Sequence, residues 1–166
     1  KQFNPGDEDW FVAGPVLRAL VGVERPLVLD VATGTGRLPL ALLRNRFAPG
    51  GQIVGLDLSR GMLDQAWAKL RSFGGERVCL VWHEADRLPF GDDLFDAVTC
   101  LEALEFLAQP RQALAEMVRV LAPGGLLMVT NWVGAGARLL PGRAMDRSSF
   151  EEALSALPLE GIEARH

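Results

Sequence analysis

The stretch LDVATGTGRL, residues 29–38, decides how this sequence is interpreted. A run of apolar residues ends at Asp30 and gives way to the loop Gly34-Thr35-Gly36. From Gly36 to about Phe47 the apolar residues recur at helical spacing. The segment is therefore predicted to form a buried strand over 27–31, a tight glycine loop and a helix.

Composition bounds the class of protein. The chain has 166 residues, of which 49% are hydrophobic and 23% charged, so we expect residues 1–166 to form a single globular domain. The net charge of -4 and the lack of a Lys/Arg cluster argue against binding to a nucleic-acid backbone. No apolar run approaches the roughly 20 residues of a membrane span. The N-terminal residues lack a signal-peptide pattern, so a cytoplasmic location is expected.

The metal-binding and disulfide-forming residues are few. Cys79 and Cys100 each lie in an apolar run that predicts a strand, and we expect both to be buried thiols in a reducing compartment. The histidines are His83 and His166 alone, so no metal site is predicted.

Strands and helices are predicted to alternate along the chain. Strands are expected at 27–31, 52–58 and 76–83, from residue 96, and at 126–132. Helices are expected at 6–20, 36–47, 59–73 and 110–121, with a loop at 84–95 and a tight turn at 122–125. The strands are near-continuous apolar runs, which favours a Rossmann-like, doubly wound, mostly parallel sheet with helices on both faces.

The C-terminal part has weaker patterns. Residues 133–146 show no clear period, and 148–157 predict a helix whose capping box pairs Ser148 with Glu151. Residues 161–166 resemble the beginning of a strand, so the C-terminal strands of the sheet are expected to be incomplete.

The glycine loop is a candidate ligand site. In such a sheet, ligands bind beyond the carboxyl ends of the strands, and a helix N-terminus offers free N–H groups to an anion. The third glycine of a dinucleotide-binding fingerprint is missing after Gly36, and a phosphate-binding Gly-Lys-Ser/Thr ending is absent. Asp57 ends the second strand, where an acid either accepts hydrogen bonds from ribose hydroxyls or caps the next helix.

The loop also resembles a known motif. Asp30 to Gly36 is similar to motif I of the class I S-adenosylmethionine-dependent methyltransferases. Three further stretches resemble that family in the same order, namely LDLSRGMLDQA (56–66), EADRLPFGDDLFDAV (84–98) and VRVLAPGGLLMVTN (118–131). The most similar subgroup contains quinone-biosynthesis and other small-molecule methyltransferases. The resemblance implies an N-terminal helical segment (1–25), a cofactor-binding core (27–131) and a substrate-side segment (132–166).

The resemblance implies S-adenosylmethionine as the cofactor, with S-adenosylhomocysteine as its product. The loop N–H groups would bind the methionine carboxylate, and Asp30 would pair with the ammonium or brace the loop. Asp57 would hold the ribose. The full set of implied cofactor contacts is Asp30, Ala32, Thr33, Gly34, Thr35, Gly36, Asp57, Leu58, Met62, Glu84, Ala85, Asp86, Leu101 and Glu102.

The remaining implied contacts are with the adenine and the sulfonium of the cofactor. Leu58 and Met62 would pack on the adenine. Glu84, with the Ala85 N–H beside it, would contact the adenine amino group, and Asp86 is the substitute if the register slips. Strand four is expected to end at Leu101 and Glu102, below the sulfonium.

Three residues depart from the family pattern. Ala32 replaces the first loop glycine, which is tolerable if its φ stays negative. Glu84 is one methylene longer than the usual Asp. Phe106 stands where the subgroup often has His after Glu105.

The expected reaction is methyl transfer to a small-molecule acceptor by in-line displacement. Glu102 and Glu105 are candidate bases by position, although Glu105 is better interpreted as a helix N-terminal acid or a solvated acid. The acceptor pocket could include Trp10, Phe11, Phe106, Trp132 and residues 133–147. The acceptor, the catalytic residue and the oligomeric state are not indicated. The alternatives are a non-catalytic S-adenosylmethionine-binding module and an NAD-dependent oxidoreductase.

Overall fold

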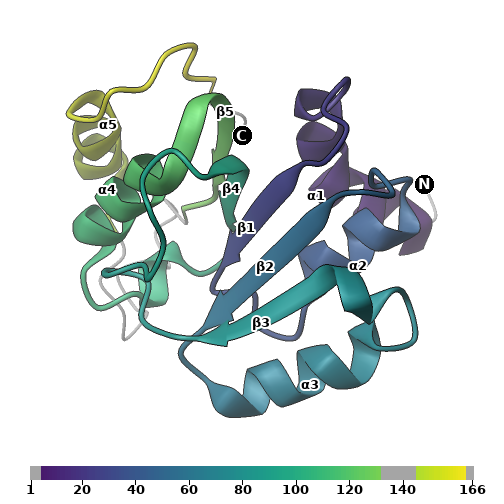
Figure 1. Ribbon diagram of the computed structural model, residues 1–166. Coiled ribbons are helices and arrows are strands. Elements are labelled where there is room, and N and C mark those ends of the chain that lie inside the picture. The colour runs from purple at the N-terminus through teal and green to yellow at the C-terminus, as the bar shows by residue number, and fades with distance from the viewer. Residues whose placement is uncertain (1–4, 132–144, 164–166) are drawn as a thin grey trace.

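A computed structural model describes residues 5–131 and 145–163 of the chain. The five strands of these residues form one parallel sheet with the order β3-β2-β1-β4-β5 (Figure 1). The strands are β1 (Leu27–Val31), β2 (Gln52–Asp57), β3 (Val78–Trp82), β4 (Phe95–Cys100) and β5 (Leu121–Val129). The helices are α1 (Pro5–Ala19), α2 (Arg37–Arg44), α3 (Arg60–Leu70), α4 (Pro110–Val120) and α5 (Arg147–Ser155), with short 3-10 helices η1 (Gly75–Arg77) and η2 (Leu104–Phe106).

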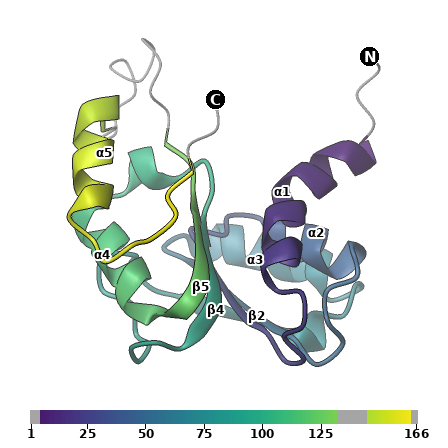
Figure 2. The same ribbon diagram turned by 90° about the horizontal axis from the view of Figure 1, so that it is seen from above.

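Helices cover both faces of the sheet (Figure 2). One cluster of buried residues joins α1, α2 and α3 to one face, and a second joins α4 and α5 to the other. The central strand β1 is buried on both faces, with Val28 in the first cluster and Leu29 in the second. This explains why its sequence is a continuous apolar run. The predicted Rossmann-like fold with helices on both faces is confirmed.

The strand order places the functional residues at one edge. The β1 strand pairs with β2 on one side and with β4 on the other, so Asp30 lies opposite both Gly55 and Thr99. The β2 strand pairs in turn with β3, and Asp57 at the end of β2 lies opposite Trp82 at the end of β3. All strands are parallel, so their carboxyl ends meet at the edge where such sheets bind ligands.

The β5 strand begins earlier than predicted. The expected tight turn at 122–125 lies within the strand as a bulge, because Phe95 pairs with Leu121 and Ala97 already pairs with Leu126. Glycine is required here. A Cβ on Gly125 would lie 2.9 Å from the carbonyl oxygen of Asp96, closer than side-chain carbons approach backbone. The bulge thus lets β4 and β5 pair on both sides of the Pro-Gly-Gly sequence.

The ends of α5 and of the described chain differ from the sequence prediction. The predicted N-terminal helix is present as α1, which contains Pro15. Ser59 caps α3 with its side chain, and α5 is capped by Asp146, whose carboxylate accepts the Ser149 N–H at 2.8 Å. The predicted capping box at Ser148 is therefore wrong, since the acid two residues earlier takes the capping position. Residues 161–163 form no strand, and residues 164–166 lie outside the described part of the chain.

The two cysteines differ in environment. Cys100 is buried in β4, as predicted, whereas Cys79 is exposed, which contradicts the prediction. The reason is that β3 is an edge strand of the sheet. Within residues 5–131 and 145–163, no helix has the length and apolar character needed to cross a bilayer. The same residues bring together no group of three potential metal ligands.

Candidate functional site

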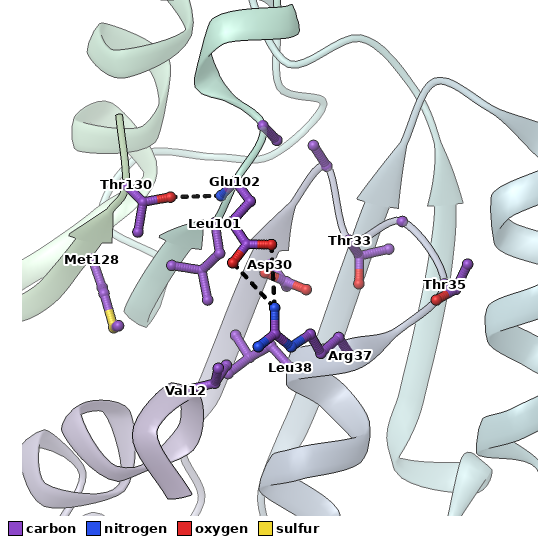
Figure 3. Close-up of a pocket in the computed structure, with 13 residues that line it drawn as sticks. Val12, Asp30, Thr33, Thr35, Arg37, Leu38, Leu101, Glu102, Met128 and Thr130 are labelled. Atoms are coloured by element: carbon purple, nitrogen blue, oxygen red, sulfur yellow. Dashed lines mark hydrogen bonds and ion pairs between the residues drawn. The ribbon is translucent and has the colours of Figure 1, made fainter. Parts of the chain in front are cut away.

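A pocket of about 290 Å³ lies at the carboxyl ends of β1, β4 and β5 (Figure 3). It is lined by Val12, Asp30, Ala32, Thr33, Gly34, Thr35, Arg37, Leu38, Leu101, Glu102, Ala103, Met128 and Thr130. The pocket thus brings together seven of the residues predicted from the sequence, namely Asp30, Ala32, Thr33, Gly34, Thr35, Leu101 and Glu102. The other seven, Gly36, Asp57, Leu58, Met62, Glu84, Ala85 and Asp86, do not line it.

The glycine loop is fixed by backbone hydrogen bonds. The Thr33 N–H donates to the Leu56 carbonyl at 2.9 Å, which ties the loop to β2. The Gly36 N–H donates to the Thr33 carbonyl, also at 2.9 Å. The backbone at Ala32 has a φ of +55°, in the left-handed region, so the condition under which alanine replaces the loop glycine without strain is not met. The loop holds this strained conformation because its neighbours fix both of its ends.

Two glycines of the loop have different reasons to be glycine. A Cβ on Gly36 would meet the Leu70 Cδ1 at 3.0 Å and the Ala66 Cβ at 3.2 Å, so this glycine lets α3 approach the loop. A Cβ on Gly34 would meet nothing within 4 Å. Gly34 has a φ of +54° and borders the pocket, so its missing side chain leaves space for a ligand.

Asp57 braces the loop from the end of β2. Its carboxylate accepts the Gly34 N–H and the Ser59 N–H, both at 2.8 Å. The side chain therefore ties the glycine loop to the first turn of α3. The contact with Ser59 is the helix-capping arrangement that the sequence left open beside ribose binding, whereas the contact with the glycine loop was not predicted for Asp57. Each carboxylate oxygen has a second lone pair, so the same group retains capacity to accept a hydroxyl.

Asp30 is the buried acid of the site. Its side chain extends from β1 and accepts the Thr99 hydroxyl at 2.7 Å, and the residue is only 4% exposed. Burial raises the pKa of Asp30 to about 6, and the charge of Asp57 adds to this, although the Thr99 hydrogen bond opposes it. A cation placed beside Asp30 would stabilise the ionised form.

An ion pair spans the pocket between α2 and the end of β4 (Figure 3). The Arg37 guanidinium lies 3.2 Å from both carboxylate oxygens of Glu102. Glu102 has a φ of +55°, and its N–H donates to the hydroxyl of Thr130, the residue after β5. Arg37 and Thr130 were not predicted as site residues from the sequence. Their positions directly after the glycine loop and at the end of the fifth strand are the signals that could have identified them.

The residues implied for the adenine lie toward β3 and are more open. Leu58 is 62% exposed and Met62 is 41% exposed, both at the start of α3. The Trp82 indole N–H donates to the Leu58 carbonyl at 2.7 Å, which holds the Leu58 backbone. The Arg60 guanidinium stacks 3.9 Å above the Trp82 ring. This end therefore presents apolar side chains on a fixed backbone.

The loop that carries Glu84, Ala85 and Asp86 is anchored to α4. Arg119 donates to the carbonyls of Leu88 at 3.1 Å and Phe90 at 2.9 Å. Glu116 accepts the Leu88 N–H at 2.8 Å. These bonds hold the loop after β3 at the same sheet edge, although residues 84–86 do not line the pocket.

Of the other residues proposed from the sequence, some are described by the structure and some are not. Glu105 lies in the first turn of η2, in agreement with the helix N-terminal alternative. It is 4% exposed and its Oε2 has no hydrogen-bond partner within the described residues, so the alternative of a solvated acid is wrong. Phe106 is exposed beside it. Trp132 and residues 133–144 lie outside the described residues, as do the side chains of Trp10 and Phe11.

Comparison with known proteins gives the family. A family model described as a methyltransferase domain matches residues 29–129, which is more than half of the chain. The chain belongs to this family. The resemblance noted from the sequence motifs is thereby confirmed.

Individual relatives are similar over much of this chain. It is 41% identical over 123 residues to the demethylmenaquinone methyltransferase of Clavibacter sepedonicus, covering 74% of this chain and 47% of that protein. It is 38% identical over 135 residues to the ubiquinone/menaquinone biosynthesis C-methyltransferase of Pseudomonas aeruginosa, covering 81% and 50%. The crystal structure of the YcgJ protein from Bacillus subtilis has a TM-score of 0.73 at 25% identity, covering 88% and 67%. The chain spans about half the length of the curated relatives it matches.

Proposed function

We propose that this chain binds S-adenosylmethionine at the carboxyl edge of its sheet and transfers the methyl group to a small quinone-type acceptor. The observation that carries the proposal is the glycine loop braced by Asp57, open at Gly34 and facing the buried acid Asp30. Membership of the methyltransferase domain family supports it.

The residues present fit this cofactor. The open space at Gly34 admits a ligand close to the backbone, and Asp30 is a buried acid suited to an ammonium group. Asp57 would accept the ribose hydroxyls with its free lone pairs. Leu58 and Met62 would pack on the adenine, and the loop at 84–86 would contact its edge. When bound, the cofactor supplies an activated methyl group on a positively charged sulfur.

The protein's contribution to the reaction is alignment in a dry pocket. Val12, Leu38, Leu101 and Met128 form apolar walls that would exclude water from the reacting atoms. Holding the acceptor atom in line with the methyl and the sulfur supplies a large part of the rate enhancement. The acceptor carbon would gain the methyl group, S-adenosylhomocysteine would leave, and the acceptor ring would release one proton.

The names of the relatives support a quinone-type acceptor methylated on carbon. An oxidised quinone ring is poor in electrons and attacks a methyl group badly. The reduced quinol is rich in electrons, and its ring carbon is a suitable nucleophile. We therefore propose the quinol as the acceptor form, with the reaction taking place in the cytoplasm.

The test is methyl transfer from labelled S-adenosylmethionine to a demethylmenaquinol analogue with a short prenyl chain. The expected product carries the label on a ring carbon, and the same compound kept oxidised remains unlabelled. Binding of the cofactor without labelling of the quinol would overturn the catalytic proposal and favour a non-catalytic binding module. Binding of NAD in place of S-adenosylmethionine would favour an oxidoreductase.

A further inference from the structure

The loop between β3 and β4 is long, and it is held chiefly by one helix. All of residues 83–94 are described by the structure, and they form no helix or strand. The first residue is tied to β2, since the His83 N–H donates to the Asp57 carbonyl at 3.2 Å. The residues after it are tied to α4. This loop carries residues 84–86, which are proposed above to contact the adenine.

The Arg119 guanidinium, near the end of α4, binds this loop at three points. Nη1 donates to the Phe90 carbonyl at 2.9 Å and to the Asp92 carboxylate at 2.7 Å. Nη2 donates to the Leu88 carbonyl at 3.1 Å. Nε and Nη2 donate to the two Glu116 carboxylate oxygens at 2.7 and 2.8 Å. Each of the five N–H donors thus has an acceptor, in a planar fork that lysine does not provide.

Glu116 adds a bond in the opposite direction. Its Oε2 accepts the Leu88 N–H at 2.8 Å, so the ion pair of Glu116 and Arg119 holds both the N–H and the carbonyl of Leu88. The hydrogen bond from Arg119 lowers the pKa of Glu116, which keeps this acceptor ionised at neutral pH. The backbone two residues after Asp86 is therefore fixed in position and direction.

Gln109 holds the same loop at the start of α4. It directly precedes Pro110, the first residue of the helix, and its Nε2 donates to the Asp86 Oδ2 at 3.3 Å. Arg119 lies at the other end of the helix, which ends at Val120. The α4 helix therefore holds the loop from both of its ends.

The residues proposed for the adenine depend on this anchoring. Glu84 is exposed, and Ala85 and Asp86 are only partly buried, so packing fixes them less than it fixes Leu88, which is 4% exposed. Hydrogen bonds weaken steeply outside a narrow range of distance and angle. A loop released from α4 would therefore lose its contacts with the adenine edge while the sheet and the pocket remain intact.

We propose that Arg119 is a positioning residue that gives the site its preference for adenine, although it does not itself line the pocket. By holding residues 88–92 it places residues 84–86 against the adenine edge, and Gln109 makes a smaller contribution at Asp86. This inference rests on the proposed function, since it requires an adenine beside this loop.

The experiment uses two ligands that differ only at the adenine edge. Calorimetric titration compares S-adenosylhomocysteine with S-inosylhomocysteine, in which a carbonyl oxygen replaces the exocyclic amino group. The unaltered protein is expected to bind S-adenosylhomocysteine about tenfold more tightly, because the amino group loses its partner in the analogue. Arg119→Lys keeps the charge without the fork, and it is expected to weaken S-adenosylhomocysteine about fivefold and the analogue less than about twofold.

Urea unfolding establishes that each variant is folded. Gln109→Ala removes only an exposed side chain, and it is expected to lower the same preference about twofold. Its result decides the question if Arg119→Lys does not fold. The matched control is Arg111→Gln, which removes the exposed pair Arg111–Glu152 between α4 and α5 and is expected to leave both affinities unchanged.

Two results would overturn the inference. Equal weakening of the two ligands by Arg119→Lys would show a merely structural role, and equal affinity of the unaltered protein for both ligands would show that the loop does not read the adenine edge. If the unaltered protein binds neither ligand, the proposed function fails instead, so the two failures are distinguishable.

Discussion

The two ends of the candidate site are built differently. At the loop end, formed by the glycine loop with Asp30, Asp57, Arg37 and Glu102, each of these four side chains is already engaged by a hydrogen bond or an ion pair. At the β3 end, formed by Leu58, Met62 and Trp82, large apolar side chains are exposed. The difference indicates that the loop end is preorganised for charged groups, whereas the β3 end offers apolar surface that a flat ring would cover.

The largest expected effect distinguishes the packing role of Gly36 from the ligand-binding role of Gly34. Gly36→Ala is expected to lower the free energy of unfolding by about 3 kcal/mol, because its Cβ meets Leu70 and Ala66 in a left-handed backbone. Gly34→Ala is expected to cost only about 1 kcal/mol, because its Cβ meets nothing. Its binding of S-adenosylhomocysteine should nevertheless fall at least tenfold.

Urea unfolding and calorimetric titration of both variants measure these effects. Equal loss of stability in the two variants would contradict the assignment of Gly36 to packing and Gly34 to the ligand.

The next effect concerns the buried acid of the loop end. The unfolded chain loses the Asp30 proton near its ordinary pKa of 3.8, whereas the folded protein keeps it to about pH 6. Between these values the folded state binds more protons, so this group lowers stability as pH rises from about 4 to about 6, with no further change above. Asp30→Asn cannot ionise and is expected to be more stable than the unaltered protein by about 3 kcal/mol at pH 7.

Urea unfolding at pH 4, 5, 6 and 7 compares the two proteins. Their stabilities should converge toward pH 4. A constant difference across the range would show that Asp30 does not titrate as described.

A smaller effect tests the β3 end. Leu58→Ala removes an exposed side chain, so stability should change by no more than about 0.5 kcal/mol. Affinity for S-adenosylhomocysteine should fall about fivefold, which corresponds to the lost apolar contact. The matched control is Leu94→Ala, because Leu94 is also exposed but precedes β4, at the opposite edge of the sheet.

Calorimetric titration with S-adenosylhomocysteine measures the affinities of the Leu58→Ala and Leu94→Ala variants. Similar affinities for both would mean that the ligand does not cover the β3 end.

The smallest effect concerns strain at Ala32. Glycine removes the cost of its left-handed backbone, about 1–2 kcal/mol, but increases the freedom of the unfolded chain. Ala32→Gly is therefore expected to stabilise the protein by about 0.5 kcal/mol in thermal unfolding. A loss of stability would show that the Ala32 methyl contributes packing that outweighs the strain.

The sequence predicted the features that depend on local patterns. The alternation of apolar strands and amphipathic helices, and the glycine loop after the first strand, were all predicted correctly. Features that depend on distant partners were missed. The ion pair of Arg37 with Glu102 joins residues far apart in the chain. The burial of Glu105, the exposure of Cys79 on an edge strand and the bulge opposite Asp96 likewise follow from tertiary packing.

The most direct measurement is a calorimetric titration with S-adenosylmethionine, S-adenosylhomocysteine and NAD, for the unaltered protein and for Asp57→Ala. Micromolar binding of the first two ligands and none of NAD is expected. Asp57→Ala should weaken binding at least tenfold, because hydrogen bonds to a charged acceptor contribute about 1.5–3 kcal/mol each. Asp64→Ala, which removes an exposed acid of α3, is the control. Undiminished binding to a folded Asp57→Ala protein, or binding of NAD alone, would contradict a cofactor site at this edge of the sheet.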